Sequence, residues 1–370
     1  MELFLSAGDP SGDNAAARVI ESLRESQQEL TFYGLGHARL ASLGQEQFAD
    51  RSKLAVLGFW EVARHWWFFR CLMQKCVNEI KSRRPKAIVL VDYPGFNLRL
   101  AKRIKKLGIP IIYYISPQVW AWGHRRVAEI RELVDLMLVI LPFEENFYSN
   151  SGVNSKFVGH YLLEDIPSEY ISSSPPHSVS RLCLLPGSRS QEVQRMLPSM
   201  LKAAQKFNHR YGTSSVVAGL SDVFDYEKAI SPYSDDGITV MYDKPRQCIF
   251  ESDIVLTASG TATLEAGIIG RPMVVVYKTG FVTYQIARQL ISLDKIALVN
   301  LVVGEKLVPE LIQRKASSEQ IVKELARFMD NKKYYELVKE RLYNIPKMLG
   351  GAGSSARAAR LIHKYLEEGH

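Results

Sequence analysis

The sequence predicts an α/β protein with two consecutive domains, each a doubly wound parallel sheet covered by helices. Three observations predict this fold class. Runs that are apolar throughout alternate with helical patterns, which is typical of parallel strands buried on both faces. The alternation stops in a stretch rich in Ser and Pro at residues 166–180 and then begins again. The length of 370 residues also favours two cores over one.

The first predicted domain covers residues 1–165. Its apolar runs, which we expect to form strands, lie at residues 3–5, 86–91, 111–115 and 136–141. Residues 15–23 have the pattern of a first helix, and a second helical pattern extends to Lys106. Because helices separate the strands, we expect the strands to run parallel in one sheet.

The second predicted domain covers residues 181–345. Strands are expected at residues 181–185, 254–257 and 273–277. A long helix follows the loop at 186–189, and another helix is expected at 261–268. This order of strand, loop and helix repeats that of the first domain, so a second sheet of the same type is expected.

Residues 346–370 are predicted to form a hinge and a terminal helix. Three glycines between residues 350 and 353 supply the hinge. The helix after them has an apolar stripe formed by Ala358, Leu361, Ile362 and Tyr365. We expect this helix to pack on a first domain, preferably that of a partner chain, and so to form a homodimer.

The composition indicates an ordinary folded protein with an anionic partner. Hydrophobic residues make up 46% of the chain, and no apolar stretch is long enough to cross a bilayer. Met1 leads directly into a strand, without the pattern of a secretory signal. The net charge of +8 suits anionic lipids or phosphorylated metabolites, and no nucleic-acid-binding module accompanies the basic clusters. The four cysteines lack ligand-like spacing, so we expect reduced thiols in the cytoplasm and no structural zinc.

A loop with two glycines joins the first predicted strand to the first helix. Gly8 and Gly12 permit a sharp turn and close approach of a ligand to the backbone. Asp9 and Ser11 place oxygen atoms at the start of the helix. The spacing differs from the G-x-G-x-x-G pattern of dinucleotide-binding folds, which disfavours NAD. A capped turn without a ligand is the alternative reading of this loop.

A series of motifs resembles those of the lipid-A-disaccharide synthase family, in the same order. The resemblance extends from about residue 5 to about residue 313, and the run Ser-Pro-Gln-Val-Trp-Ala-Trp is especially specific. In this chain the motifs lie at residues 6–13, 91–97, 116–122, 141–144, 157–160, 185–189 and 258–265. Asp9 stands where many relatives have a glutamate, and Gly95 where many have a second aspartate.

The resemblance implies a glycosyltransferase with two Rossmann-like domains, the GT-B architecture, and an active site in the cleft between them. The implied reaction transfers 2,3-diacylglucosamine, with inversion, from its UDP derivative to 2,3-diacylglucosamine 1-phosphate. The products are the β-1,6-linked lipid A disaccharide 1-phosphate and UDP. The resemblance also implies a cytoplasmic enzyme associated peripherally with the inner membrane and its anionic surface.

Two alternatives remain open at this point. One is another UDP-sugar enzyme of the same architecture, such as a transferase with a polyprenyl-linked acceptor or an epimerase. The other is a nucleotide-binding protein of the membrane surface that has no turnover.

Asp92 is the predicted catalytic base. It lies at the carboxyl end of a buried strand, where open parallel sheets place their ligands. Pro94 restricts the preceding residue and ends the strand, leaving the carboxylate in a loop. A carboxylate that deprotonates a sugar hydroxyl needs such a fixed and partly desolvated position. A structural aspartate that caps the next helix is the alternative.

Two loops of the second domain are predicted to bind the nucleotide sugar. Each follows a strand and starts a helix, an arrangement that directs backbone N–H groups at a phosphate. Arg189 adds a positive fork for a diphosphate, and Glu265 lies one helical turn beyond the second loop, within reach of a ribose. Asn300 is carried over from the family as a donor-site residue. The predicted set is Gly187, Ser188, Arg189, Ser259, Gly260, Thr261, Glu265 and Asn300.

Aromatic residues near the start of the helix expected over 59–80 are predicted to contact a membrane. Trp60, Trp67 and Phe68 fall outside the apolar stripe of that helix, near cationic residues. A helix buried on several sides is the alternative. The chain has no Asp-x-Asp pair, so we predict neither a metal nor a cofactor, and Arg189 with the helix starts would neutralise the diphosphate.

Overall fold

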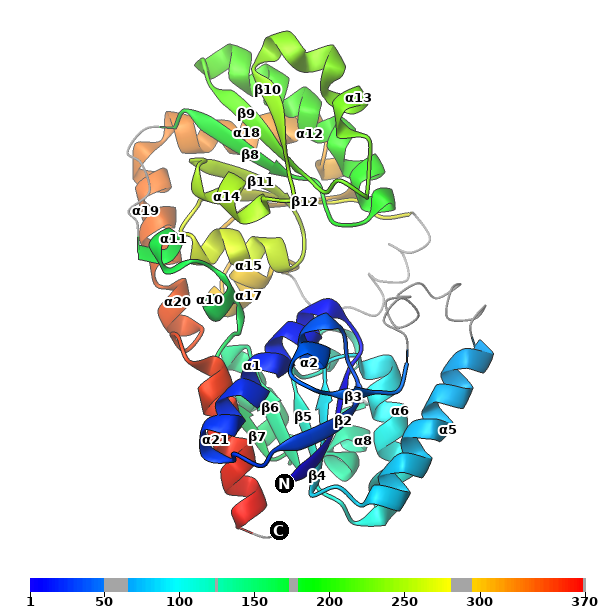
Figure 1. Cartoon of the computed structure of the whole chain (residues 1–370). Helices are drawn as coiled ribbons and strands as arrows, with labels where there is room; N and C mark the ends of the chain where they lie inside the picture. Colours follow the sequence, from blue (N-terminus) through cyan, green and yellow to red (C-terminus); the bar gives the residue numbers. More distant parts are fainter. Residues whose placement is uncertain (50–65, 124–125, 173–178, 281–294, 369–370) are drawn as a thin grey trace. The chain divides into compact units, whose positions relative to one another are not determined.

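The structure is a computed structural model that describes residues 1–49, 66–123, 126–172, 179–280 and 295–368. The chain divides into two compact units (Figure 1). Unit 1 comprises residues 1–161 and 350–370, and unit 2 comprises residues 162–349. The boundary therefore precedes the Ser- and Pro-rich stretch at 166–180 in which we expected the linker, and part of that stretch forms a helix, α11 (Ser168–Ser172).

Unit 1 contains a seven-stranded sheet in which every neighbouring pair is parallel. The strand order reverses between β1 and β4, which makes the carboxyl ends of these two strands the switch point where such sheets bind ligands. From edge to edge the strands are β3 (Glu46–Gln47), β2 (Thr31–Leu35), β1 (Glu2–Ala7), β4 (Ala87–Val91), β5 (Ile111–Tyr114), β6 (Leu136–Val139) and β7 (Ser155–Phe157).

Helices cover both faces of this sheet (Figure 1). One face carries α5 (Trp66–Arg83), α6 (Pro94–Ile104) and α8 (Arg126–Leu133), whose apolar side chains join strand residues in one buried cluster. The other face carries α1 (Pro10–Ser26) and α21 (Ser354–Glu367). The remaining helical segments are α2 (Ala38–Ser42), η1 (Lys105–Leu107), α7 (Val119–Trp122) and α9 (Pro142–Ser149).

The terminal helix α21 packs along α1 of the same chain. Ile362 is fully buried, the side chains of Gln27 and His363 bond at 2.8 Å, and Arg357 Nε donates to the Val158 carbonyl at 2.8 Å. The helix thus reaches the first domain, as expected, but within its own chain. Exchange of α21 between two chains stays a prediction.

Unit 2 contains a six-stranded parallel sheet whose strand order reverses between β8 and β11. In order, the strands are β10 (Ile238–Tyr242), β9 (Ser214–Gly219), β8 (Arg181–Leu185), β11 (Ile254–Ala258), β12 (Met273–Tyr277) and β13 (Glu310–Ile312). Its other elements are α10 (Leu162–Asp165), α12 (Ser190–Tyr211), α13 (Tyr226–Ile230), η2 (Ser231–Asp236), α14 (Pro245–Phe250), α15 (Thr261–Ile268), α17 (Leu298–Val303), η3 (Gln313–Lys315), α18 (Ser318–Asp330), α19 (Lys332–Tyr343) and α20 (Ile345–Met348).

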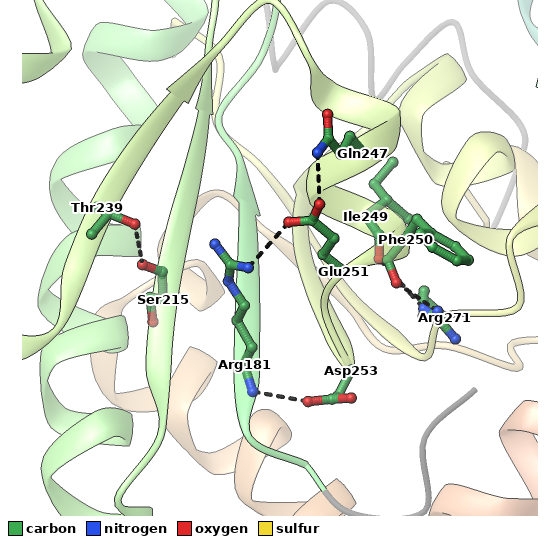
Figure 2. A network of polar contacts seen from close by, with 9 residues as sticks. All are labelled: Arg181, Ser215, Thr239, Gln247, Ile249, Phe250, Glu251, Asp253 and Arg271. Atoms are coloured by element: carbon green, nitrogen blue, oxygen red, sulfur yellow. Dashed lines mark hydrogen bonds and ion pairs between the residues drawn. The ribbon is translucent and has the colours of Figure 1, made fainter. Parts of the chain in front are cut away.

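Polar contacts join the starts of the two central strands of unit 2 (Figure 2). The Asp253 carboxylate, just before β11, accepts the backbone N–H of Arg181 at 2.9 Å, and the Arg181 guanidinium pairs with Glu251 at 3.2 Å. Arg271 donates to the Phe250 carbonyl at 2.6 Å and so caps the end of α14. These contacts fix the amino ends of the strands, while the loops that could bind a ligand lie at the carboxyl ends.

None of the helices within the described residues has both the length and the apolar character that crossing a bilayer requires.

Candidate functional site

Asp92 lies directly after β4, at the switch point of the unit 1 sheet, in a strained backbone conformation. Asp92 and Tyr93 have φ values of 45° and 47°, in the left-handed region that non-glycine residues rarely adopt. Such residues cost about 1–3 kcal/mol each and persist only where the surroundings hold them. The Asp92 carbonyl accepts the Tyr113 hydroxyl at 2.6 Å, and its N–H donates to the Tyr114 carbonyl at 2.9 Å. Neighbouring strand β5 thus holds the loop that carries the carboxylate.

Asn97, which the sequence analysis did not select, joins the ends of β1 and β4. It is fully buried on the first turns of α6. Its amide donates to the Asp92 carbonyl at 2.8 Å, and its Oδ1 accepts the Ser6 hydroxyl at 2.7 Å. The signal in the sequence was its place in the motif at 91–97, but its partner Ser6 lies 91 residues away.

The two glycines of the first loop permit close contacts. A Cβ at Gly8 would collide with the ring of Tyr93, so the glycine lets that ring lie against the backbone. A Cβ at Gly12 would lie 2.6 Å from Oδ1 of Asp9, which accepts the Gly12 N–H at 2.7 Å as the N-cap of α1. Neither glycine has a positive φ, so the expected sharp turn is not their role. Ser11 is exposed beside them.

The surroundings of Asp92 favour its protonated form at acidic and near-neutral pH. Burial, the negative charge of Asp9 and that of Glu144 raise the pKa of Asp92 to about 7, opposed by a hydrogen bond from the Tyr93 N–H. A general base with a pKa near the working pH has both the correct protonation state and useful basicity. The geometry and the electrostatics of this loop therefore suit proton abstraction.

Glu144 is a second buried carboxylate of unit 1, to which the sequence analysis assigned no role. It lies on the first turn of α9 and accepts four hydrogen bonds. One oxygen accepts the hydroxyl of Ser116 at 2.8 Å and the indole N–H of Trp120 at 2.9 Å. The other accepts the backbone N–H groups of Leu141 at 3.0 Å and Ile140 at 3.3 Å. Burial raises the pKa of the Glu144 carboxyl, and these donors oppose that effect.

The Glu144 contacts fix the loop after β5. Trp120 is buried, with its ring edge-on to Phe143 at 5.0 Å, and the Tyr148 hydroxyl donates to the Pro117 carbonyl at 2.6 Å. The motifs at 116–122 and 141–144, which follow neighbouring strands, therefore form one hydrogen-bonded assembly next to the strand that carries Asp92.

The loop after β8 presents its donors to solvent. Gly187 has a φ of 122°, which a side chain would strain. The Arg189 side chain is 68% exposed and its guanidinium pairs with Oε1 of Glu192 at 2.9 Å. The other Glu192 oxygen accepts the Ser188 N–H at 3.3 Å. The loop thus holds a carboxylate with the same donors that we expect to bind a diphosphate.

The loop after β11 is tied to the segment before α17. Gly260, with a φ of 135°, is the N-cap of α15, and Thr261 is exposed at the first position of that helix. The Ser259 hydroxyl donates to the carbonyl of Ile296 at 3.2 Å. Its hydroxyl oxygen and the N–H groups at the start of α15 face the same end of the sheet as the β8 loop.

Glu265 and Asn300 have internal partners. The Glu265 carboxylate pairs with Nε of Arg246 at 2.8 Å, so a ribose would share it with that guanidinium. Asn300 is fully buried, and its amide bonds to both backbone groups of Val308 and to Glu310. It therefore contributes to a donor site only by fixing the loop that contains Val308, because its side chain has no hydrogen left for a ligand.

The three aromatic residues expected at a membrane differ in position. Trp67 is 68% exposed at the start of α5. Phe68 is half-buried and packs against the core of unit 1, which corrects the expectation that it faces outward with Trp67. Trp60 lies outside the described residues.

Within the described part of the chain, no group of three or more His, Cys, Asp or Glu residues lies close enough to hold a metal ion. The cleft expected between the two domains stays a prediction.

Comparisons with known proteins place the chain among sugar-transferring enzymes. A family model described as lipid-A-disaccharide synthetase matches residues 3–354. The lipid-A-disaccharide synthase of Myxococcus xanthus is 37% identical over 375 residues, which cover 99% of this chain and 98% of that protein. That of Nitrosococcus oceani is 38% identical over 370 residues, covering 98% and 95%.

Solved structures share the fold at low sequence identity. The UDP-GlcNAc 2-epimerase of Neisseria meningitidis, bound to UDP-GlcNAc, aligns with a TM-score of 0.61 and 12% identity over all of both chains. A glycosyltransferase of Siraitia grosvenorii in complex with UDP has the same TM-score and identity, over 99% of each chain. At these identities the likeness establishes the fold, two α/β domains with parallel sheets, and no particular activity.

Proposed function

This chain belongs to the lipid-A-disaccharide synthase family, and from this premise we propose its reaction and the residues that perform it. It is a glycosyltransferase that joins two acylated sugars. It transfers 2,3-diacylglucosamine from its UDP derivative to 2,3-diacylglucosamine 1-phosphate and forms the β-1,6-linked disaccharide. The observation that carries the proposal is the Asp92 carboxylate, which is held in a strained loop at the switch point with its pKa raised to about 7.

Asp92 acts as the general base. Its carboxylate accepts the proton of the acceptor 6-hydroxyl while that oxygen attacks the anomeric carbon of the donor. The bond from the anomeric carbon to the diphosphate breaks in the same displacement, which inverts the configuration. The electron pair of that bond leaves on UDP.

The loops of unit 2 bind UDP and stabilise the departing charge. The N–H of Ser188, the guanidinium of Arg189 and the first N–H groups of α15 bind the diphosphate oxygens. The diphosphate displaces Glu192 from Ser188 and Arg189, because it offers these donors more negative charge. Gly187, Ser259, Gly260 and Thr261 shape the two loops, and Glu265 accepts a ribose hydroxyl.

Glu144 is a positioning residue in this scheme. It joins the Ser116–Trp120 loop to α9 and adds negative charge near Asp92. We assign the loop of Asp9 and Ser11, next to Tyr93, to the acceptor.

The enzyme works at an anionic membrane surface, with Trp67 and Trp60 at the interface. We also propose a homodimer in which α21 contributes to the contact. A chain ending at Leu349 tests the second point. It is expected to lose stability and to become a monomer, and an unchanged oligomeric state with full activity would overturn it.

Incubation of the full chain with both acylated sugars tests the reaction through release of UDP. A transferase releases UDP only when the acceptor is present, and the Asp92→Asn variant should release almost none. An epimerase would convert the UDP-sugar without an acceptor, and a binding protein without turnover would leave both sugars unchanged. Either result would contradict the proposal.

A further inference from the structure

A large pocket of unit 2 is lined by cations that the proposed reaction does not use. It has a volume of about 1110 Å³ and lies beside the residues that follow β12 and β13. Six basic side chains from α12, α18 and three loops line it, against a single acidic one, Glu310. The basic residues are Arg195, Lys278, Lys306, Arg314, Lys315 and Arg327. Neither of the two loops assigned to UDP contributes a lining residue.

The one acidic side chain of the pocket is already engaged. The Glu310 carboxylate accepts the backbone N–H of Ile296 and of Ala297, each at 3.0 Å, and the Asn300 amide at 2.8 Å. These donors belong to the residues just before α17 and to α17 itself, and they hold the carboxylate in one position. Glu310 is therefore a structural acceptor, and its one negative charge faces six basic side chains.

Three of the six cations have no acidic partner among the described residues. Within the described residues, no ion pair joins Arg195, Arg314 or Lys315 to a carboxylate. Lys278 donates to a neutral group, the Ser199 hydroxyl, at 3.0 Å, and burial lowers its pKa. Arg327 is the exception, since it pairs with Glu324 at 2.6 Å. The pocket thus gathers positive charge from several elements, with Lys278 partly buried and Arg195, Arg314 and Lys315 exposed around it, an arrangement that attracts an anion.

The cations stand on a rigid frame. Gln313 has a φ of 55°, and its side-chain amide contacts both backbone groups of Thr279, at 3.0 Å and 3.2 Å. This clasp joins the segment after β13, with Arg314 and Lys315, to the segment after β12, with Lys278. The two backbone segments that carry these three cations are therefore joined before a ligand binds, which lowers the cost of bringing the charges together.

We propose that this pocket binds a phosphate-bearing ligand at a site distinct from the UDP loops. Two arginines without acidic partners supply the planar forks that suit phosphate oxygens, and the lysines add point charges. Leu307, Val308, Pro309 and Ile312 line the same pocket and provide apolar contact beside the charge. A soluble diphosphate and the headgroup of an anionic lipid share this chemistry.

Charge reversal in the pocket tests the proposal with two probes. Inorganic pyrophosphate is titrated calorimetrically into the full chain carrying Arg189→Ala, so that the UDP loop contributes little. Co-sedimentation with vesicles of phosphatidylglycerol and phosphatidylcholine measures binding to a lipid headgroup. Both the titration and the co-sedimentation are done at low salt, where screening is weak. The double variant Arg314→Glu with Lys315→Glu should weaken the probe that binds by roughly tenfold or more, because two attractions become repulsions.

The matched control is Lys228→Glu with Lys244→Glu. These exposed lysines follow β9 and β10, at the opposite edge of the sheet from β13, and give the same change in net charge. Loss of pyrophosphate binding in the pocket variant alone assigns a soluble phosphate, and loss of vesicle binding alone assigns a lipid headgroup. Equal losses in both variants, or no binding of either probe to the parent chain, would overturn the proposal.

If the double variant does not unfold cooperatively and is therefore misfolded, Arg195→Gln replaces it in the same two binding measurements. Arg195 is exposed on α12, so this substitution should leave the fold intact. UDP affinity, measured separately, distinguishes this site from the proposed function. A protein that retains UDP release but binds neither probe would refute the pocket proposal and leave the reaction intact.

Discussion

The carboxylate that we propose as the base, at the end of β4 in unit 1, is largely withdrawn from water, whereas the cation that we propose for the diphosphate, at the start of α12 in unit 2, is exposed to water. Asp92 is held by Tyr113, Tyr114 and Asn97, and its pKa is raised to about 7. The Arg189 side chain is 68% exposed and pairs with Glu192, three residues further along the chain. Both residues follow a strand at the switch point of a parallel sheet, although on opposite sides of it, because β4 corresponds to β11 in strand order and β8 corresponds to β1.

The difference follows from the chemistry proposed for each loop. A base that removes a proton from a hydroxyl gains basicity from desolvation and must be fixed in place. A diphosphate is strongly charged, so it can form charge-assisted hydrogen bonds with donors that are exposed to water, and it can dissociate from them after the reaction. Substitutions in the two loops test whether unit 1 supplies the catalytic base and unit 2 binds the nucleotide.

Asp92→Asn should have the largest effect, because it removes the base without changing the shape of the loop. We expect kcat to fall by about 10²–10⁴-fold, with UDP affinity nearly unchanged. Steady-state rates of UDP release and calorimetric titration of UDP measure the two quantities. A rate close to that of the parent would remove Asp92 from the mechanism.

Arg189→Ala should show the converse pattern. Loss of a charge-assisted bond to phosphate costs about 1.5–3 kcal/mol, so UDP affinity should fall at least tenfold. Arg210→Ala is the control, since Arg210 lies at the other end of α12 and pairs with Asp330 at the surface. Unchanged UDP affinity in Arg189→Ala would mean that the donor loop is misassigned.

Glu144→Gln should alter the rate and its pH dependence together. The variant keeps the size of the side chain but removes a negative charge that raises the pKa of Asp92. The pKa of Asp92 should fall, so the acidic limb of the kcat/KM profile should move to lower pH. The rate at its plateau should fall roughly tenfold, because the loop of Trp120 loosens. Glu145→Gln, the neighbouring carboxylate, should leave the profile in place.

The raised pKa of Asp92 should also appear as a stability cost. Its pKa rises from 3.8 to about 7, so the folded state binds this proton more tightly than the unfolded state. The free energy of unfolding therefore falls as pH increases between these values. Asp92→Asn should raise Tm at pH 8 by roughly 2–6 °C and leave it unchanged near pH 4, as calorimetry would show. An equal gain at both pH values would contradict this origin.

The smallest effects are expected at the start of α5. Trp67→Glu should weaken co-sedimentation with anionic vesicles several-fold and leave Tm unchanged, because the ring is exposed. Phe68→Glu should lower Tm instead, since Phe68 packs against the core. If both variants behave alike, the two rings share one environment.

The sequence analysis predicts the strands on both sides of the two switch points and misses others, among them the interior strands β2 and β9 and the edge strand β10. β1, β4, β5, β8, β11 and β12 are continuous apolar runs, which the pattern identifies. β3, β7 and β13 have two or three residues and are partly exposed, so no periodicity marks them. The sheets exist because the central strands bury their side chains, and the edges follow from neighbours rather than from their own sequence.

The residues of the candidate site also differ in how far the sequence predicts them. Asp92 and Arg189 were predictable because each stands in a motif next to a strand end. The supporting residues were not, since Asn97 depends on Ser6 across 91 residues and Glu144 on Ser116 across 28. Arg246 pairs with the Glu265 carboxylate, and Glu310 accepts the backbone N–H of Ile296. These partners are distant in sequence and become neighbours only in the folded protein.

The return of α21 to α1 has a consequence during synthesis. The ribosome makes residues 162–349 after the rest of unit 1 and before α21. At about 5–20 residues per second, this interval lasts roughly 10–40 s. Unit 1 therefore emerges without its last helix, and the face of α1 that α21 will cover waits until unit 2 has been translated. Translation rate or a chaperone acting in that interval should decide how much of the nascent protein reaches the folded state.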